Sequence, residues 1–346
     1  LAEMWLDEQT DFAAVGTTAQ VWSRAEWIEQ TFASWYPLAG PVIDALAKAL
    51  AEGPASGQAG EDPLGMLSQM LAPMMQSMAR NMYGAHFAQA LAKLSTGVVS
   101  ASDIGFRLAD PRVALLGDNI AKHFGELDVP ETDVWLYLAL REAARQRLFA
   151  HVGWLAPQLQ ALVEHFARET RIDLSAIEES ISFEDIGSLT PEKLQQMSQD
   201  LQGRLFSMDP TPEQAEILER LQTLMALVEG WVDHVVALAA SQMPSRDALA
   251  EAVRRRRGVG GPSEEALKAL VGLELRPRRV RDAANLWAAI AKDRGAQERD
   301  ALWSHPDVLP DTTALDDPMG FVQGNTPSSP EPELDDWDKG CLLYTS

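Results

Sequence analysis

The sequence predicts a mainly α-helical fold with at most a small, short-stranded sheet. Apolar residues recur at intervals of three and four along most of the chain, which places them on one face of a helix. Two segments open with a capping residue followed by a proline, at Thr190-Pro191 and Thr211-Pro212, as helix starts often do. Patterns typical of strands are nearly absent, and only residues 105–108 and 113–116 are candidates for short strands.

Ten segments carry the helical pattern. In chain order they are residues 22–36, 42–50, 64–94, 132–149, 155–166, 191–206, 212–240, 246–257, 263–270 and 278–291. Within the third segment, Pro73 predicts a kink or a split. The same segment has a methionine at every fourth position from Met66 to Met82. We interpret this row as core packing, and an adaptable groove for apolar segments is the alternative.

Turn-forming residues divide the chain into three parts. A Gly/Ala/Pro/Ser-rich stretch at residues 53–62 separates an N-terminal helical segment, 1–52, from a helical body, 63–322. Residues 323–346 have the composition of a disordered acidic tail. Its last seven residues, 340–346, are apolar and uncharged, and we interpret them as non-native.

Charge and cysteine content exclude several classes of protein. The formal net charge of the 346 residues is −22, which would repel nucleic acids and anionic membranes. No uncharged apolar run reaches the ~18 residues that a membrane-spanning helix needs. The single cysteine, Cys341, excludes internal disulfides and fits a reducing compartment. We therefore expect a cytoplasmic protein without nucleic-acid or membrane partners.

Two short charged motifs lie inside apolar helical segments. The first is Arg141-Glu142-Ala143-Ala144-Arg145 and the second is Glu229-Gly230-Trp231-Val232-Asp233. Residues four apart share a helix face, so each motif presents two charges side by side. Taken alone, these charges are compatible with ordinary pairs on the surface. The apolar residues around them favour an inward orientation, toward a partner.

These motifs resemble the two halves of a zincin active site. A zincin carries His-Glu-x-x-His on one helix, and its gluzincin branch adds Glu-x-x-x-Asp on a later one. The chain is similar to the zincin-like metallopeptidases of actinobacteria, which are candidate zinc-dependent hydrolases. The likeness covers roughly residues 4–322 and includes these further segments: Trp5-Leu6-Asp7-Glu8, Ala19-Gln20-Val21-Trp22-Ser23-Arg24-Ala25-Glu26-Trp27, Leu136-Tyr137-Leu138-Ala139-Leu140, Leu273-Glu274-Leu275-Arg276-Pro277-Arg278-Arg279 and Ala301-Leu302-Trp303-Ser304-His305-Pro306-Asp307.

The resemblance implies a role for each motif residue. Glu142 stands where the general base stands, Arg141 and Arg145 replace the two zinc-binding histidines, and Glu229 occupies the position of the third ligand. Asp233 corresponds to the acid that orients a ligand histidine. Two guanidiniums would supply the positive charge that zinc supplies, but they cannot activate a water as zinc does. We therefore expect no bound metal or other cofactor, and a vestigial site.

Two functions follow from this degenerate motif. The first is a non-catalytic interaction or scaffold protein that binds an unidentified protein or peptide. The alternative is a zinc-dependent hydrolase that uses Glu142 as general base together with unorthodox ligands. The six histidines offer no ligand-like spacing: His151 lies beyond the first motif, His165 is on the next helix, His234 is off the Glu229 face, and His86, His123 and His305 are isolated.

A basic block interrupts the acidic chain at Arg254-Arg255-Arg256-Arg257, and more arginines follow between residues 276 and 281. In isolation the block would suggest a phosphate or nucleic-acid patch. We favour salt bridges to the acidic body or to the acidic tail, which high salt would weaken.

Overall fold

The structure is a computed structural model that describes residues 1–52, 84–85, 87–168, 211–258, 268 and 279–324. Several predictions therefore lie outside the described residues: the linker at 53–62, the methionine row, the helix at 191–206 and the acidic tail. The described chain is mainly helical, with one sheet of two very short strands, so the predicted fold class is confirmed.

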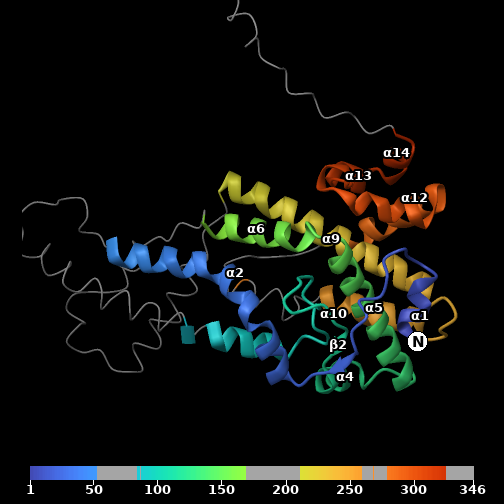
Figure 1. Ribbon diagram of the computed structural model, residues 1–346, viewed down its shortest axis with the longest axis horizontal. Helices are drawn as coiled ribbons and strands as arrows, with labels where there is room; N and C mark the ends of the chain where they lie inside the picture. Colours follow the sequence, from blue (N-terminus) through green and yellow to red (C-terminus); the bar gives the residue numbers. More distant parts are fainter. Residues whose placement is uncertain (53–83, 86, 169–210, 259–267, 269–278, 325–346) are drawn as a thin grey trace, which may run out of the picture.

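Four helices form the centre of the fold. They are α5 (Glu131–His151), α6 (Leu155–Arg168), α9 (Pro212–Ala239) and α12 (Val280–Ala301). Figure 1 shows α9 crossing α5 and running beside α6, with α12 against its other end. Each lies where apolar periodicity predicted it, although α12 continues ten residues past the predicted end at 291. A single cluster of buried apolar side chains joins all four.

The central helices bury more than one face. Along α5 almost every residue from Val134 to Phe149 is buried, and the arginines and glutamate of the first motif are among them. Along α9 the buried stretch runs from Met225 to Val232 without a break. A helix buried all round has no solvent-facing side for its charges. The charged motif residues must therefore find partners inside the protein.

The N-terminus of α9 is closed by a capping box. Thr211 accepts a hydrogen bond from the backbone N–H of Gln214, whose side chain accepts one from the backbone N–H of Thr211. Pro212 occupies the first helical position, where its missing N–H costs nothing. The predicted start of this helix is confirmed.

Replacing Thr211 with alanine should lower the free energy of unfolding by about 1 kcal/mol, because the backbone N–H of Gln214 loses its side-chain acceptor. Chemical denaturation of the variant beside the parent measures this. A Thr313→Ala control removes a threonine hydroxyl that caps no helix and bonds only to nearby Asp311. Equal losses in the two variants would contradict a specific role for the capping box.

The small sheet pairs distant parts of the chain. Strand β1 (Gln20–Val21) runs parallel to β2 (Ala114–Leu115), in the register Gln20 to Ala114 and Val21 to Leu115. The strand predicted at 113–116 is therefore present in shorter form. The strand predicted at 105–108 is wrong: Gly105 has a φ of +84° and its N–H donates to Ser102, so the chain turns there.

Near the N-terminus, one long helix takes the place of two predicted helices. Residues 22–36 and 42–50 predict two helices, but a single helix, α2, runs over Arg24–Glu52 through Pro37 and Pro41. Proline removes one backbone hydrogen bond and bends a helix without always ending it, and α2 changes direction along its length (Figure 1). The short helix α1 (Ala2–Asp7) was not predicted, and it packs against α5 and α9.

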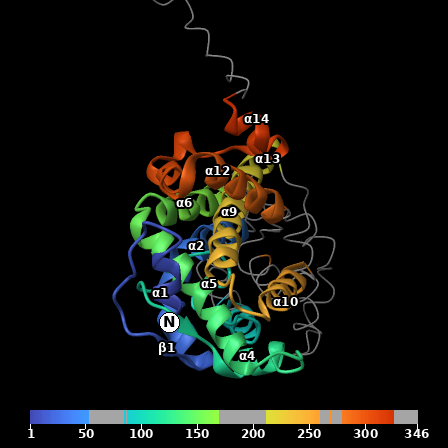
Figure 2. The ribbon, with the colours of Figure 1, turned by 90° about the vertical axis from the view of Figure 1, so that its right-hand side faces the viewer.

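The remaining elements surround the central helices. Helix α4 is Gly117–Phe124, α10 is Arg246–Gly258, α13 is Thr312–Asp316 and α14 is Pro318–Val322, and two 3₁₀ turns cover Leu302–Ser304 and Pro306–Val308. In Figure 2, α10 and α1 lie on opposite sides of α5, while α13 and α14 lie beyond α12.

Among the described residues, one helix, α9, is long and apolar enough to cross a membrane. However, 61% of its most apolar window is buried inside the protein. This degree of burial is what a core helix shows.

Candidate functional site

The two charged motifs meet in the interior, between α5 and α9. Arg141 bridges both acids of the second motif, with Nη2 at 3.0 Å from Glu229 Oε2 and Nη1 at 2.6 Å from Asp233 Oδ1. Arg145, one turn further along α5, places Nε at 2.6 Å from Glu229 Oε1. The spacing of four in each motif gives the two helices facing pairs of opposite charge. The surface alternative for these charges is therefore wrong.

Glu229 is the centre of this cluster. Its carboxylate accepts hydrogen bonds from Arg141 and Arg145, and also from Arg257 at the end of α10. Burial raises the pKa of Glu229, but the charges of Arg145, Arg257 and Arg141 lower it more, so its pKa lies well below the usual range. The pKa of Asp233 is lowered for the same reason, against burial, by Arg141 and Arg257. Both carboxylates are therefore ionised near neutral pH.

Glu142 lies in a separate polar shell on the far side of Arg145. The side chain is fully buried, and its carboxylate accepts a 2.8 Å hydrogen bond from Ser102 Oγ and another of 2.8 Å from Gln146 Nε2. Arg145 Nη1 lies 3.4 Å from it. Burial raises the pKa of Glu142 above its usual value, although Arg145 and the hydrogen bonds act in the opposite direction.

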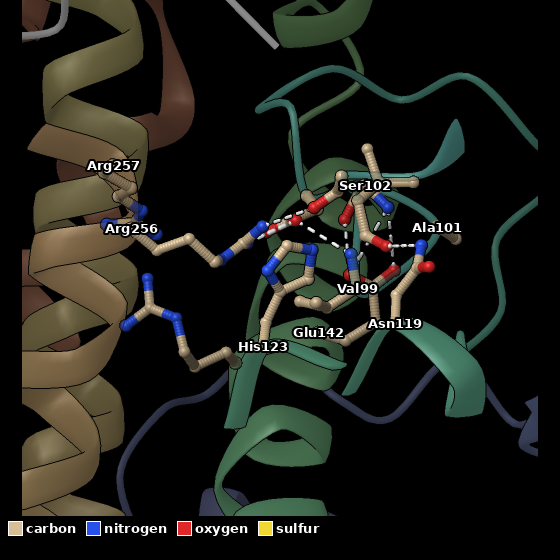
Figure 3. Close-up of polar contacts among 12 residues, drawn as sticks. Val99, Ala101, Ser102, Asn119, His123, Glu142, Arg256 and Arg257 are labelled. Atoms are coloured by element: carbon tan, nitrogen blue, oxygen red, sulfur yellow. Dashed lines mark hydrogen bonds and ion pairs between the residues drawn. The ribbon is translucent and has the colours of Figure 1, made fainter. Parts of the chain in front are cut away.

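A second buried ion pair extends the site toward α10. Arg256 binds the carboxylate of Asp103 and donates to the carbonyl of Gly97 at 2.7 Å, while Asp103 accepts a 2.9 Å bond from the backbone N–H of Val99. Figure 3 shows Arg256 reaching from its helix toward the loop that carries Ser102, with His123 beside it. The pKa of His123 is lowered by burial and by the charge of Arg256.

The sequence did not place Arg256 and Arg257 in the site. It predicted that the basic block binds acids of the body, and for these two residues that prediction is confirmed. Arg254 and Arg255 behave differently, because they are exposed and pair with Glu251 on their own helix. Ser102 and Gln146 were missed as well. Gln146 follows Glu142 by four residues, a spacing that predicts contact on a helix.

The inner residues of the second motif serve packing. A Cβ on Gly230 would lie 2.6 Å from Ala283 Cβ and 2.7 Å from the backbone nitrogen of Ala284, so only glycine lets α9 and α12 approach this closely. Trp231 is buried and donates from Nε1 to Asp300 at 2.9 Å. Asp300 also accepts a 2.6 Å bond from Thr10 and is paired with Arg299.

The histidines in the described residues lie outside the charged cluster. His151 donates from Nδ1 to the carbonyl of Arg147, His165 faces Glu213, and His305 faces Asp307. His234 is half-buried, and burial together with Arg299 lowers its pKa to about 4. His86 lies outside the described residues. None of the five described histidines bonds to Glu142, Glu229 or Asp233.

A comparison with known protein families shows which family the chain belongs to. The sequence profile of the family described as zincin-like metallopeptidase matches residues 1–322. The chain belongs to this family. The match takes in both charged motifs and α1 to α14, so the N-terminal segment is covered together with the helical body.

One solved structure resembles the zincin-like chain over nearly its whole length. It is a crystal structure from Chloroflexus aurantiacus, described as a candidate hydrolase with a novel fold. The two chains are 17% identical, the TM-score is 0.58, and the alignment covers 95% of this chain and 87% of the other. At this identity the likeness shows a shared fold. A search of curated proteins finds no match.

The residues of this zincin-like protein do not fit the zinc that its family name implies. A guanidinium carries only N–H donors and has no lone pair for a metal, so Arg141 and Arg145 cannot be ligands. Glu229 could be one, but its oxygens are already bound by three guanidiniums. Among the residues that the structure describes, no three His, Cys, Asp or Glu side chains are grouped so as to hold a metal ion.

What the arrangement offers chemically is a network of charged groups that neutralise one another. Three guanidiniums, Arg141, Arg145 and Arg257, face three carboxyl groups, Glu142, Glu229 and Asp233. Each positive group is hydrogen-bonded to at least one negative group. Such a network fixes the relative position of α5, α9 and α10.

Proposed function

We propose that this zincin-like metallopeptidase is a non-catalytic member of its family that acts as an interaction or scaffold protein. The observation that carries the proposal is the set of side chains that bind the carboxylate of Glu229. The carboxylate in the position of the third zinc ligand binds Arg141, Arg145 and Arg257 instead. Arginine replaces the charge of a metal but not its Lewis acidity, so no water is activated here.

Glu142, the vestigial general base, has contacts that argue against a hydrolytic role. A raised pKa is common in catalytic carboxylates. Here, however, Glu142 has no solvent exposure, and Ser102, Gln146 and Arg145 occupy its oxygens. A general base must reach a water or a substrate proton within hydrogen-bond distance. These contacts favour the scaffold over the alternative, a zinc-dependent hydrolase with unorthodox ligands.

Partner class and location follow from the charge of the chain. With a net charge of −22, nucleic acids and anionic membranes are disfavoured, and a protein or peptide partner is favoured. The chain has no cysteine before Cys341, which suits a reducing compartment, so we infer a cytoplasmic location.

Zinc binding tests the proposed function directly. In a calorimetric titration with Zn²⁺, the parent should show no stoichiometric site, and elemental analysis of the purified protein should find no zinc. The double change Arg141→His, Arg145→His should create a site with Glu229 as third ligand, because histidines at i and i+4 can reach one tetrahedral ion. Asp233 would then be available to orient an imidazole.

The parent and the double variant test two different parts of the argument: the loss of catalysis and the assignment of the zincin motif. Stoichiometric zinc in the parent would overturn the non-catalytic proposal in favour of the hydrolase. No gain of zinc affinity in the folded double variant would mean that the zincin motif has been assigned to the wrong residues. The exposed pair Arg254→His, Arg255→His is the matched control, because it adds two histidines to α10 outside the cluster.

A further inference from the structure

Solvent reaches the charged cluster at one end. The side chains of Arg141, Glu142, Arg145 and Glu229 are at most 6% exposed, whereas those of Asp233 and Arg257 are 20% and 21% exposed. Among the charged groups of the cluster, these two therefore form its opening. A ligand that entered the cluster would first contact the carboxylate of Asp233 and the guanidinium of Arg257.

Arg257 is the guanidinium that the cluster least requires. Arg257 binds Glu229 and lies 3.4 Å from Asp233, but each of these carboxylates keeps another guanidinium if Arg257 leaves: Glu229 keeps Arg141 and Arg145, and Asp233 keeps Arg141 at 2.6 Å. The pKa of Arg257 is lowered by burial and by repulsion from Arg141, whereas the pKa values of Arg141 and Arg145 are raised. The three guanidiniums thus differ in how strongly the cluster holds them, and Arg257 is the one most readily exchanged for another cation.

The position of Arg257 makes exchange a local event. It lies in the last turn of α10, which ends at Gly258, and the buried residues of that helix are Val253 and Leu249, one turn and two turns earlier. Arg256 lies in the same turn, so exchange would proceed by rotation of the Arg257 side chain and not by unwinding of the turn. Such a rotation would leave Arg256 bound to Asp103 and α5 packed on α9.

We propose that the Glu229–Asp233 carboxylate pair is a binding site for an arginine side chain of a partner protein, occupied in the isolated chain by Arg257. The present contacts define the chemistry: Arg257 donates from Nη2 to Glu229 and from Nη1 to Asp233, so one guanidinium spans two carboxylates one helical turn apart. The rigid fork of arginine suits this geometry, whereas a lysine ammonium is a single point of charge. The strongly acidic chain would also attract a basic partner. This inference deepens the proposed interaction role and rests on it.

Calorimetry with a short blocked peptide, acetyl-Ala-Arg-Ala-amide, tests the site. Removal of the internal competitor in Arg257→Ala should tighten binding of the peptide by about tenfold or more over the parent, since the parent must first release Arg257. The same peptide with lysine in place of arginine should bind the variant several-fold less tightly. Adding Asp233→Asn to Arg257→Ala should remove the gain.

Arg255→Ala is the matched control, because it removes an arginine from the same helix that pairs only with exposed Glu251. Equal binding of the arginine peptide by the parent, Arg255→Ala and Arg257→Ala would overturn the site. If Arg257→Ala does not fold, as judged by circular dichroism, Arg257→Gln serves in its place, since it keeps the stem and removes the charge. The outcome is distinct from that of the zinc titration: a zinc-free parent together with no gain of arginine binding in Arg257→Ala would refute the site and leave the scaffold role standing.

Discussion

Replacing Arg145 with alanine is expected to lower the free energy of unfolding by about 3 to 5 kcal/mol, because it leaves the buried carboxyl group of Glu142 without its cation. Arg145 is 1% exposed and binds both Glu229 and Glu142. Glu229 keeps two other guanidiniums, but Glu142 loses the cation that Arg145 provides. Urea denaturation of the variant and the parent gives the difference.

Arg255→Ala provides the comparison within the same chain. Its side chain is 77% exposed and pairs with Glu251 on the surface of α10, so its loss should change stability by less than about 1 kcal/mol. If Arg145→Ala and Arg255→Ala unfold at the same urea concentration, the cluster contributes no more than a surface pair. That result would remove the energetic basis for a structural role of these arginines.

The deficit of Arg145→Ala should also depend on pH. The pKa of Glu142 is raised in the folded state, so its contribution to stability is present below the unfolded pKa and is lost as the pH rises through the raised value. Glu229 and Asp233 have lowered pKa values, so their contributions are present above the unfolded pKa and are lost as the pH falls. Removing Arg145 raises the pKa of Glu142 and Glu229. The deficit should therefore be largest near pH ~7 and shrink toward pH ~4, where unfolded carboxylates begin to protonate.

Gly230→Ala is expected to destabilise the protein by about 1 to 3 kcal/mol, even though alanine favours helices over glycine by about 1 kcal/mol. The added methyl group would lie 2.6 Å from Ala283 Cβ and 2.8 Å from the Ala283 carbonyl carbon, and the backbone of α12 cannot move aside like a flexible side chain. Since Glu229 precedes Gly230, separating the helices would also disturb the charged cluster. Thermal and urea denaturation measure the loss.

Gly40→Ala is the matched control for this prediction. Gly40 also lies inside a helix, α2, but a Cβ there would meet nothing within 4 Å. Alanine gains helix propensity there, but the following Pro41 disfavours a Cβ in the helical region, so the same substitution should change stability by less than about 1 kcal/mol. A clearly larger loss at Gly230 than at Gly40 would attribute the cost to helix contact. A stabilising effect at Gly230 would contradict the close approach of α9 and α12.

Much of the helical framework was predictable from the sequence, because it depends on local periodicity: apolar spacing located α5, α6, α9, α10 and α12. The spacing of four placed the charges of each motif on one helix face, but that spacing alone was also compatible with surface pairs. The resemblance to zincins favoured the meeting of the two motifs that the structure contains. The predicted partition into an N-terminal segment and a body stays a prediction, as do the roles of Arg141, Glu142, Arg145, Glu229 and Asp233.

Long-range pairing was not predictable from the sequence. The parallel partners Gln20 and Ala114 are two-residue strands with no alternating pattern of their own. Arg256 and Arg257 enter the site because α10 packs with its last turn toward α9, and nothing in a run of four arginines distinguishes these two from Arg254 and Arg255. Local sequence predicts which face of a helix is apolar, whereas the order in which helices come together is set by the whole chain.

Asp300 connects parts of the chain that are synthesised far apart in time. Its carboxylate accepts hydrogen bonds from Thr10, 290 residues earlier, and from Trp231, 69 residues earlier. At a translation rate of about 5 to 20 residues per second, roughly 15 to 60 s pass between the synthesis of Thr10 and that of its acceptor. During that interval the indole of Trp231 and the hydroxyl of Thr10 lack this acceptor, and the α9 surface that α12 will cover stays open. The central helices therefore cannot reach their final packing until residue 300 has emerged from the ribosome.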